Sequence, residues 1–170
     1  IVVGTRTATG VFNTSAGDTI SLGNGADITG VDGEGAGAGA TLDANNLILA
    51  NGASVTMTAA QSTSFDGTVT AAGTETITLS NAADATGVAN VENYVLAAGS
   101  QTFTLGAAAQ NVTGDGTGGG GAITIDTSTL TSVTGTFADG GGDDTVALTL
   151  SADGVDISGA TTTTVNTIAL

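Results

Sequence analysis

The chain has 170 residues and a formal net charge of −15, because it contains 16 acidic residues, one basic residue and no histidine. One arginine cannot replace the counterions around a phosphate backbone, which excludes nucleic acid as a partner. No apolar run reaches the roughly 18 residues of a membrane helix, which excludes insertion into a bilayer.

The composition favours a folded all-β domain. Hydrophobic residues make up 40% of the chain and charged residues only 10%, which is unlike a disordered segment. Threonine is β-branched and suits strands, whereas the 28 glycines supply the backbone freedom that tight turns need. We expect one all-β domain over residues 1–170, in a processed chain or a segment of a larger surface protein.

Several segments alternate threonine or another polar residue with an aliphatic one, a pattern typical of strands. In chain order they are 54–58, 74–79, 101–105 and 122–125. Segments rich in Gly, Asn and Asp, such as 33–39, 114–121 and 138–144, predict the turns between strands. A helical turn is expected only in the alanine-rich stretch 106–110.

A tetrapeptide recurs along the chain: a polar residue, a small or aliphatic one, Thr or Ser, and then Gly. It occupies 27–30, 84–87, 111–114, 132–135 and 156–159, and its last four glycines are 27, 21 and 24 positions apart. This spacing is the size of one coil of a β-solenoid. We therefore predict a right-handed parallel β-solenoid with coils of about 20 to 30 residues. A β-sandwich is the alternative, and the matches could also arise by chance in a chain so rich in Thr and Gly.

The segment 17–27 carries the most specific motif. Gly23, Gly25 and Asp27 match the pattern G-G-x-G-x-D-x-U-x, and Asp18 precedes Asp27 by nine positions. The segment resembles the hemolysin-type calcium-binding nonapeptide of the RTX β-roll, although the expected tandem copies are missing. A second match covers 139–146, where Asp139 replaces the first glycine.

The RTX resemblance implies bound Ca²⁺, which takes six to eight oxygen ligands from carboxylates and turn carbonyls. The candidate ligands that it implies are Asp18, Asp27, Asp139, Asp143, Asp144 and Asp153. The alternative is that these aspartates and glycines are ordinary turn formers.

A second resemblance covers more of the chain with less specific motifs. The coils rich in Thr, Ala and Gly, and segments such as 87–96 and 164–170, are similar to the solenoid repeats of bacterial S-layer proteins and large adhesins. That resemblance implies an extracellular location at the bacterial cell surface, assembly into homo-oligomers or homopolymers, and contact with cell-surface polysaccharide.

Catalysis is not expected from this set of side chains. Without His, Cys or Lys the chain lacks the usual nucleophiles and bases, and a pair of carboxylates of the glycosidase type is the only remaining route. Carbohydrate sites add aromatic platforms, and the chain has only one Tyr and four Phe. We therefore expect no enzyme.

The expected function is that of an extracellular structural protein that self-assembles into a surface layer, a fibre or an adhesin stalk, with calcium as a stabilising ion. The alternative is a ligand-binding module, either an adhesin head or an ice-binding solenoid. Thr-x-Thr pairs at 56/58, 68/70, 76/78 and 102/104 resemble those of ice-binding solenoids, but their irregular spacing predicts no flat row of threonines.

Overall fold

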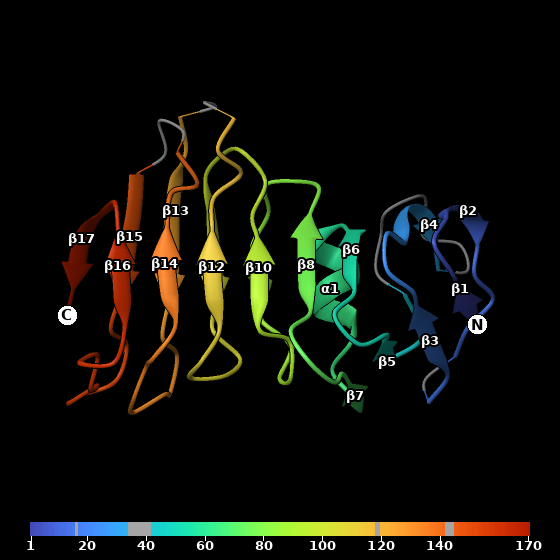
Figure 1. Cartoon of the computed structure of the whole chain (residues 1–170), viewed down its shortest axis with the longest axis horizontal. Helices are drawn as coiled ribbons and strands as arrows, with labels where there is room; N and C mark the ends of the chain where they lie inside the picture. The colour runs from blue at the N-terminus through green and yellow to red at the C-terminus, as the bar shows by residue number, and fades with distance from the viewer. Residues whose placement is uncertain (16, 34–41, 118–119, 142–144) are drawn as a thin grey trace.

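The computed structural model describes residues 1–15, 17–33, 42–117, 120–141 and 145–170. The chain forms a parallel β-solenoid of about 7 turns, with the N-terminal coil at one end of the stack and the C-terminal coil at the other (Figure 1). Every strand pair is parallel, which confirms the predicted solenoid and rules out the sandwich alternative. Within the described ranges no helix has the length and hydropathy that a membrane crossing requires.

Three sheets contain the strands. Sheet A consists of β1 (Val2–Val3), β3 (Thr19–Leu22), β5 (Asn46–Leu49) and β7 (Val69–Thr70). Sheet B runs along the whole stack and consists of β2 (Thr7–Val11), β4 (Asp27–Asp32), β6 (Ser54–Met57), β8 (Thr76–Leu79), β10 (Asn93–Val95), β12 (Asn111–Thr113), β14 (Thr136–Ala138) and β16 (Thr161–Thr163). Sheet C consists of β9 (Ala85–Thr86), β11 (Gln101–Thr104), β13 (Ala122–Asp126), β15 (Thr145–Thr149) and β17 (Val165–Ala169).

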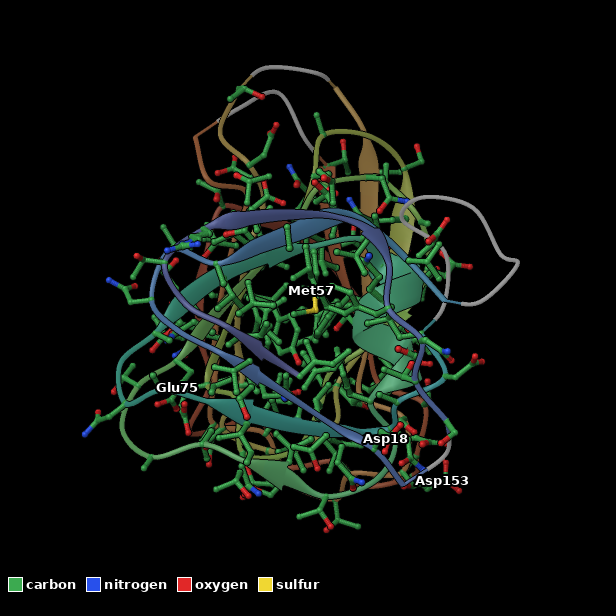
Figure 2. All side chains as sticks on the ribbon, turned by 90° about the vertical axis from the view of Figure 1, so that its right-hand side faces the viewer. Asp18, Met57, Glu75 and Asp153 are labelled. Carbon is green, nitrogen blue, oxygen red and sulfur yellow. The ribbon has the colours of Figure 1, made fainter. Side chains whose placement is uncertain are left out.

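The core lies between the sheets and follows the alternation seen in the sequence. In β8, Thr76 and Thr78 point outward and are half-buried, whereas Ile77 and Leu79 point inward and are buried. Met57 occupies the middle of the cross-section in Figure 2, which looks along the stack. Each inward side chain packs mainly on its neighbours in the adjacent coils, so the stack itself buries the apolar surface.

The tetrapeptide repeat is correct for only one pair of coils. Ser132 pairs with Asp156, so the last two copies stack directly. The copies at 84–87 and 111–114 lie in different sheets, on β9 and β12 and the residues that follow them, and their spacing is not a coil length. Coils have different lengths: 18 positions separate Asn93 from Asn111, and 25 separate Asn111 from Thr136.

The helix of the described chain is α1 (Ala59–Ser64), at a place where no helix was expected. Thr58 caps it, because its side chain accepts a hydrogen bond from the Gln61 N–H at 3.1 Å while Gln61 Oε1 accepts one from the Thr58 N–H at 2.9 Å. This is the capping box of the pattern T-x-x-Q. The segment 106–110, where a helical turn was expected, forms a turn closed by Gln110 N–H and Ala107 O at 3.4 Å.

Sheet A ends at β7, and sheet C begins at β9 after a break in the strand order. The segment 87–92 continues the side of sheet A, because Asn90 donates to Val69 O, whereas β9 continues the side of α1. Before this break, sheets A and B are joined by the short turns 23–26 and 50–53; after it, the connections 87–92 and 105–110 are longer and add their own core side chains, such as Val88 and Leu105. The cross-section thus changes from one half of the stack to the other. The helix α1 packs against β9 at this change.

Candidate functional site

The first two calcium candidates lie in different sheets. Asp18 is exposed in the turn before β3 of sheet A, where its Oδ2 accepts hydrogen bonds from the Ser15 N–H at 2.9 Å and the Ser15 hydroxyl at 3.2 Å. Asp27 begins β4 of sheet B, and its Oδ1 accepts from the N–H and hydroxyl of Thr29 at 2.9 and 2.7 Å. Each carboxylate therefore closes its own local turn, and the two do not share a binding loop.

The remaining candidates lie near the other end of the stack. Asp139 follows β14, and Asp153 is exposed in the connection between β15 and β16. Asp18 and Asp153 overlap in Figure 2 only because the view runs along the stack; they belong to the first and last coils (Figure 1). Asp143 and Asp144 lie outside the described residues.

Several aspartates form the same turn, which the nonapeptide motif did not reveal. Asp115, Asp126, Asp139 and Asp156 each accept, through a carboxylate oxygen, the N–H of the residue two positions later, at 2.8 to 3.0 Å. These N–H groups stabilise the charged carboxylate, so the pKa of Asp139 is lowered by Gly141 and that of Asp156 by Ser158. The Thr117 hydroxyl and N–H lower the pKa of Asp115 in the same way.

The described residues bring no three acidic, His or Cys side chains together in a way that could hold a metal ion. In this part of the chain the aspartates act as turn formers, which was the alternative interpretation of the motif. Calcium binding by the candidate ligands stays a prediction, because it depends partly on Asp143 and Asp144.

A pair of glutamates lies at the corner before sheet B and was not singled out in the sequence. Glu75 is fully buried; its Oε1 accepts the Gly52 N–H at 3.0 Å, and its Oε2 has no hydrogen-bond partner. Glu92, one coil further, accepts the Glu75 N–H through its Oε2 at 3.1 Å. Each carboxylate therefore reaches back to a backbone N–H of the preceding coil. Both glutamates directly precede a strand of sheet B, β8 for Glu75 and β10 for Glu92, and this shared position was the signal available in the sequence.

A cleft lies between the end of α1, β7 and the segment that follows β9 in the next coil. It has a volume of about 740 Å³ and is lined by 62–63, 65–69, 86–90 and Gly106. The Asn90 side chain crosses it and donates to the Val69 carbonyl at 3.2 Å. Phe65 and Val88 form its buried floor. The cleft has one carboxylate, that of Asp66, and therefore lacks the paired acids that hydrolysis of a glycosidic bond needs.

On six of the eight strands of sheet B, from β6 to β16, the outer face carries two rows of small side chains; the second row continues at Asp27 of β4, which pairs with Thr56. Strand pairing aligns six residues in a first row and six in a second, and we call these twelve residues the outer B face. The first row is Ser54, Thr76, Asn93, Asn111, Thr136 and Thr161, and the second is Thr56, Thr78, Val95, Thr113, Ala138 and Thr163. All twelve are uncharged and at least partly exposed.

The Thr-x-Thr pairs do not share one row, because the pair 76/78 lies in sheet B, the pair 102/104 lies in sheet C and Thr70 lies in sheet A. The connections between strands differ in length, however, and they absorb the irregular spacing, so that Thr78 lies beside Thr56 and Thr76 beside Ser54. Strands β8 to β16 lie side by side as nearly parallel arrows in Figure 1.

Comparison with protein-family models, with curated proteins and with solved structures finds no match to this chain.

Proposed function

We propose that the chain is an extracellular structural segment of a bacterial surface protein, and that it self-assembles into a layer, a fibre or a stalk. The observation that carries the proposal is sheet B, one parallel sheet of eight strands that runs along the whole stack. A solenoid of this kind is stabilised by contacts between neighbouring coils, so it extends in one dimension without a central catalytic cavity.

Self-assembly is supported by the strand edges. Among the described strands, β2 and β16 each pair with a single neighbour, so each can accept a further parallel strand from a second copy. The Thr161 N–H donates to Gly135 O at 3.0 Å and therefore faces β14. Because successive residues of a strand turn their N–H groups to opposite sides, the Thr162 N–H faces the free edge.

The net charge of −15 opposes this association, since copies of the chain repel each other at low ionic strength. Calcium would reduce that repulsion, and this is the role we propose for the ion. Cell-surface polysaccharide is a proposed partner of the assembled form.

The test is the mass of the purified chain by light scattering, and its shape by electron microscopy, in millimolar Ca²⁺ and in chelator. We expect filaments or sheets that grow with protein concentration, and more of them with Ca²⁺. Thr162→Pro removes the outward N–H and should block growth, whereas the matched variant Thr162→Ala keeps that N–H and should assemble. Monomers under all conditions would contradict self-assembly, whereas equal assembly in Ca²⁺ and chelator would remove only the role of the ion.

A further inference from the structure

Two turns of the chain carry the pair Asn–Gly at the same corner of successive coils. The turns are 23–26 and 50–53, and the sequence has no other Asn–Gly pair. In each turn the last N–H donates to the first carbonyl, at 3.1 Å in 23–26 and at 2.9 Å in 50–53. Asn24 and Asn51 are both exposed, so water reaches both side chains.

An asparagine that precedes glycine can react with the backbone, because glycine has no Cβ to hinder the approach of its nitrogen. The glycine nitrogen forms a bond to Cγ of the asparagine. The side-chain nitrogen leaves as ammonia, which takes up the proton that the glycine nitrogen loses. Water then opens the resulting succinimide ring at either carbonyl, and the product is aspartate or isoaspartate with one additional negative charge.

The conformation of both turns opposes this attack. A closing hydrogen bond together with a positive φ at the third residue, 79° at Gly25 and 67° at Gly52, defines a type II turn. In such a turn the ψ angle of the second residue is about +120°, which directs the next nitrogen away from the side chain of that residue. Ring closure therefore requires the peptide group between Asn and Gly to rotate, and its rate depends on the hydrogen bonds that hold this group.

Backbone atoms of the next coil hold the first turn. The Gly25 N–H donates to Ser54 O at 2.7 Å, which fixes the attacking nitrogen. Asn24 Oδ1 accepts the Ser54 N–H at 2.9 Å, which fixes the side chain that would be attacked. Both reacting groups of this turn are therefore tied to the same residue of β6.

The second turn is held by one side chain. The Gly52 N–H donates to Oε1 of Glu75 at 3.0 Å, and Glu75 is fully buried. The carboxamide of Asn51 lies over Gly73 and makes no hydrogen bond with a described residue. The attacking nitrogen is therefore restrained by Glu75, whereas the side chain that it would attack is free.

We propose that Asn51 is a deamidation site of the folded chain and that Glu75 controls its rate. Rotation of the peptide group between Asn51 and Gly52 breaks the hydrogen bond to Glu75, and the free carboxamide is then open to attack. Asn24 reacts more slowly, because its turn must break two hydrogen bonds to the backbone of Ser54. The product has a new carboxylate next to the residue that Glu75 contacts, so the reaction weakens the contact between these coils.

The test measures the rate of deamidation at both asparagines in one sample. The purified chain is incubated at mildly alkaline pH, and mass spectrometry of its peptides quantifies the conversion of amide to acid at each site. A parallel sample in urea gives the rate of each site without structure. We expect both sites to react more slowly in the folded chain than in urea, with Asn51 faster than Asn24. Equal protection of the two sites, or slower reaction at Asn51, would overturn the proposal.

Two variants of Glu75 form a matched pair. Glu75→Ala removes the acceptor for the Gly52 N–H and should raise the rate at Asn51 at least about tenfold, because a hydrogen bond to a charged group is strong. Glu75→Gln keeps an acceptor and should react more slowly at Asn51 than Glu75→Ala does. Equal rates at Asn51 in the two variants would contradict the role of the hydrogen bond.

Two controls separate local opening of the turn from a general loss of stability. The rate at Asn24 should stay at its native value in Glu75→Ala, while circular dichroism establishes that the chain is folded. Gln110→Ala loses hydrogen bonds in the other half of the stack and should leave both rates unchanged. An equal increase at Asn24 in Glu75→Ala, or a tenfold increase at Asn51 in Gln110→Ala, would contradict control by Glu75.

Discussion

A single buried glutamine should contribute unusually strongly to the stability of the solenoid. The Gln110 side chain donates through Nε2 to Val88 O at 2.8 Å and Val91 O at 3.1 Å. Its Oε1 accepts from the Gly106 N–H at 2.8 Å and the Ala107 N–H at 3.2 Å. One side chain thus satisfies backbone groups of its own coil and of the preceding one.

The variant Gln110→Ala removes all four hydrogen bonds. The Gly106 and Ala107 N–H groups are accessible enough to bond to water, and Val88 O keeps the Val91 N–H at 3.3 Å, but the carbonyl of the buried Val91 loses the amide that it accepts from. At 1 to 3 kcal/mol for a buried unsatisfied group and about 1 kcal/mol for the hydrogen bond lost at Val88 O, the free energy of unfolding should fall by about 3 kcal/mol.

The matched control is Gln101→Ala. Gln101 is the same residue type and is 5% exposed, against 1% for Gln110, but its amide donates only to Ala97 O, and its Oε1 has no partner. The loss of methylene packing is common to both variants, so the control should cost at least about 2 kcal/mol less. Urea denaturation followed by circular dichroism measures both values. Equal losses of unfolding free energy in the two variants would refute the inference that the hydrogen bonds of Gln110 stabilise the contact between coils.

Two further outcomes follow from the described contacts. Gly106→Ala should destabilise by about 3 kcal/mol, since its Cβ would lie 1.8 Å from Gly87 O, while Gly4→Ala, which meets nothing within 4 Å, should keep the native Tm. Folding lowers the pKa of Asp115, Asp139 and Asp156, so acidification should remove stability as the pH falls through and below the ordinary carboxyl pKa of 3.8. A variant with all three aspartates changed to Asn should therefore lose less Tm between pH 5 and pH 2 than the native chain. An identical loss of Tm would contradict the assignment to these three residues.

The strands were predictable because their pattern is local. Segments 54–58, 74–79, 101–105 and 122–125 each contain a strand of the structure, and the alternation identified which side chains are buried. The parallel solenoid was also predictable from composition, since short Thr-rich strands without proline or bulky side chains suit coils that stack. The capping box at Thr58 and Gln61 was present in the sequence, and attention to it would have located α1.

The register between coils could not be predicted in the same way. A tetrapeptide search assumes that equal motifs occupy equal places, but 84–87 and 111–114 lie in different sheets because the connections differ in length. The rows of the outer B face could not be recognised in the sequence for the same reason, because strand pairing and not sequence spacing aligns their residues. The buried roles of Glu75 and Gln110 depend on backbone groups of another coil, and no local pattern specifies those.

Side chains have different structural roles at different positions of each coil. Inward residues such as Ile77 and Phe137 stabilise the stack, and corner residues such as Gln110 and Asp139 satisfy the backbone where it turns. Outward residues of sheet B contribute as well, since Asn93 donates to Glu75 O at 3.0 Å and Asn111 Oδ1 accepts the Thr136 N–H at 2.8 Å. Polar side chains in this fold are therefore used mainly where one coil meets the next, because the backbone groups that leave the strands there need partners.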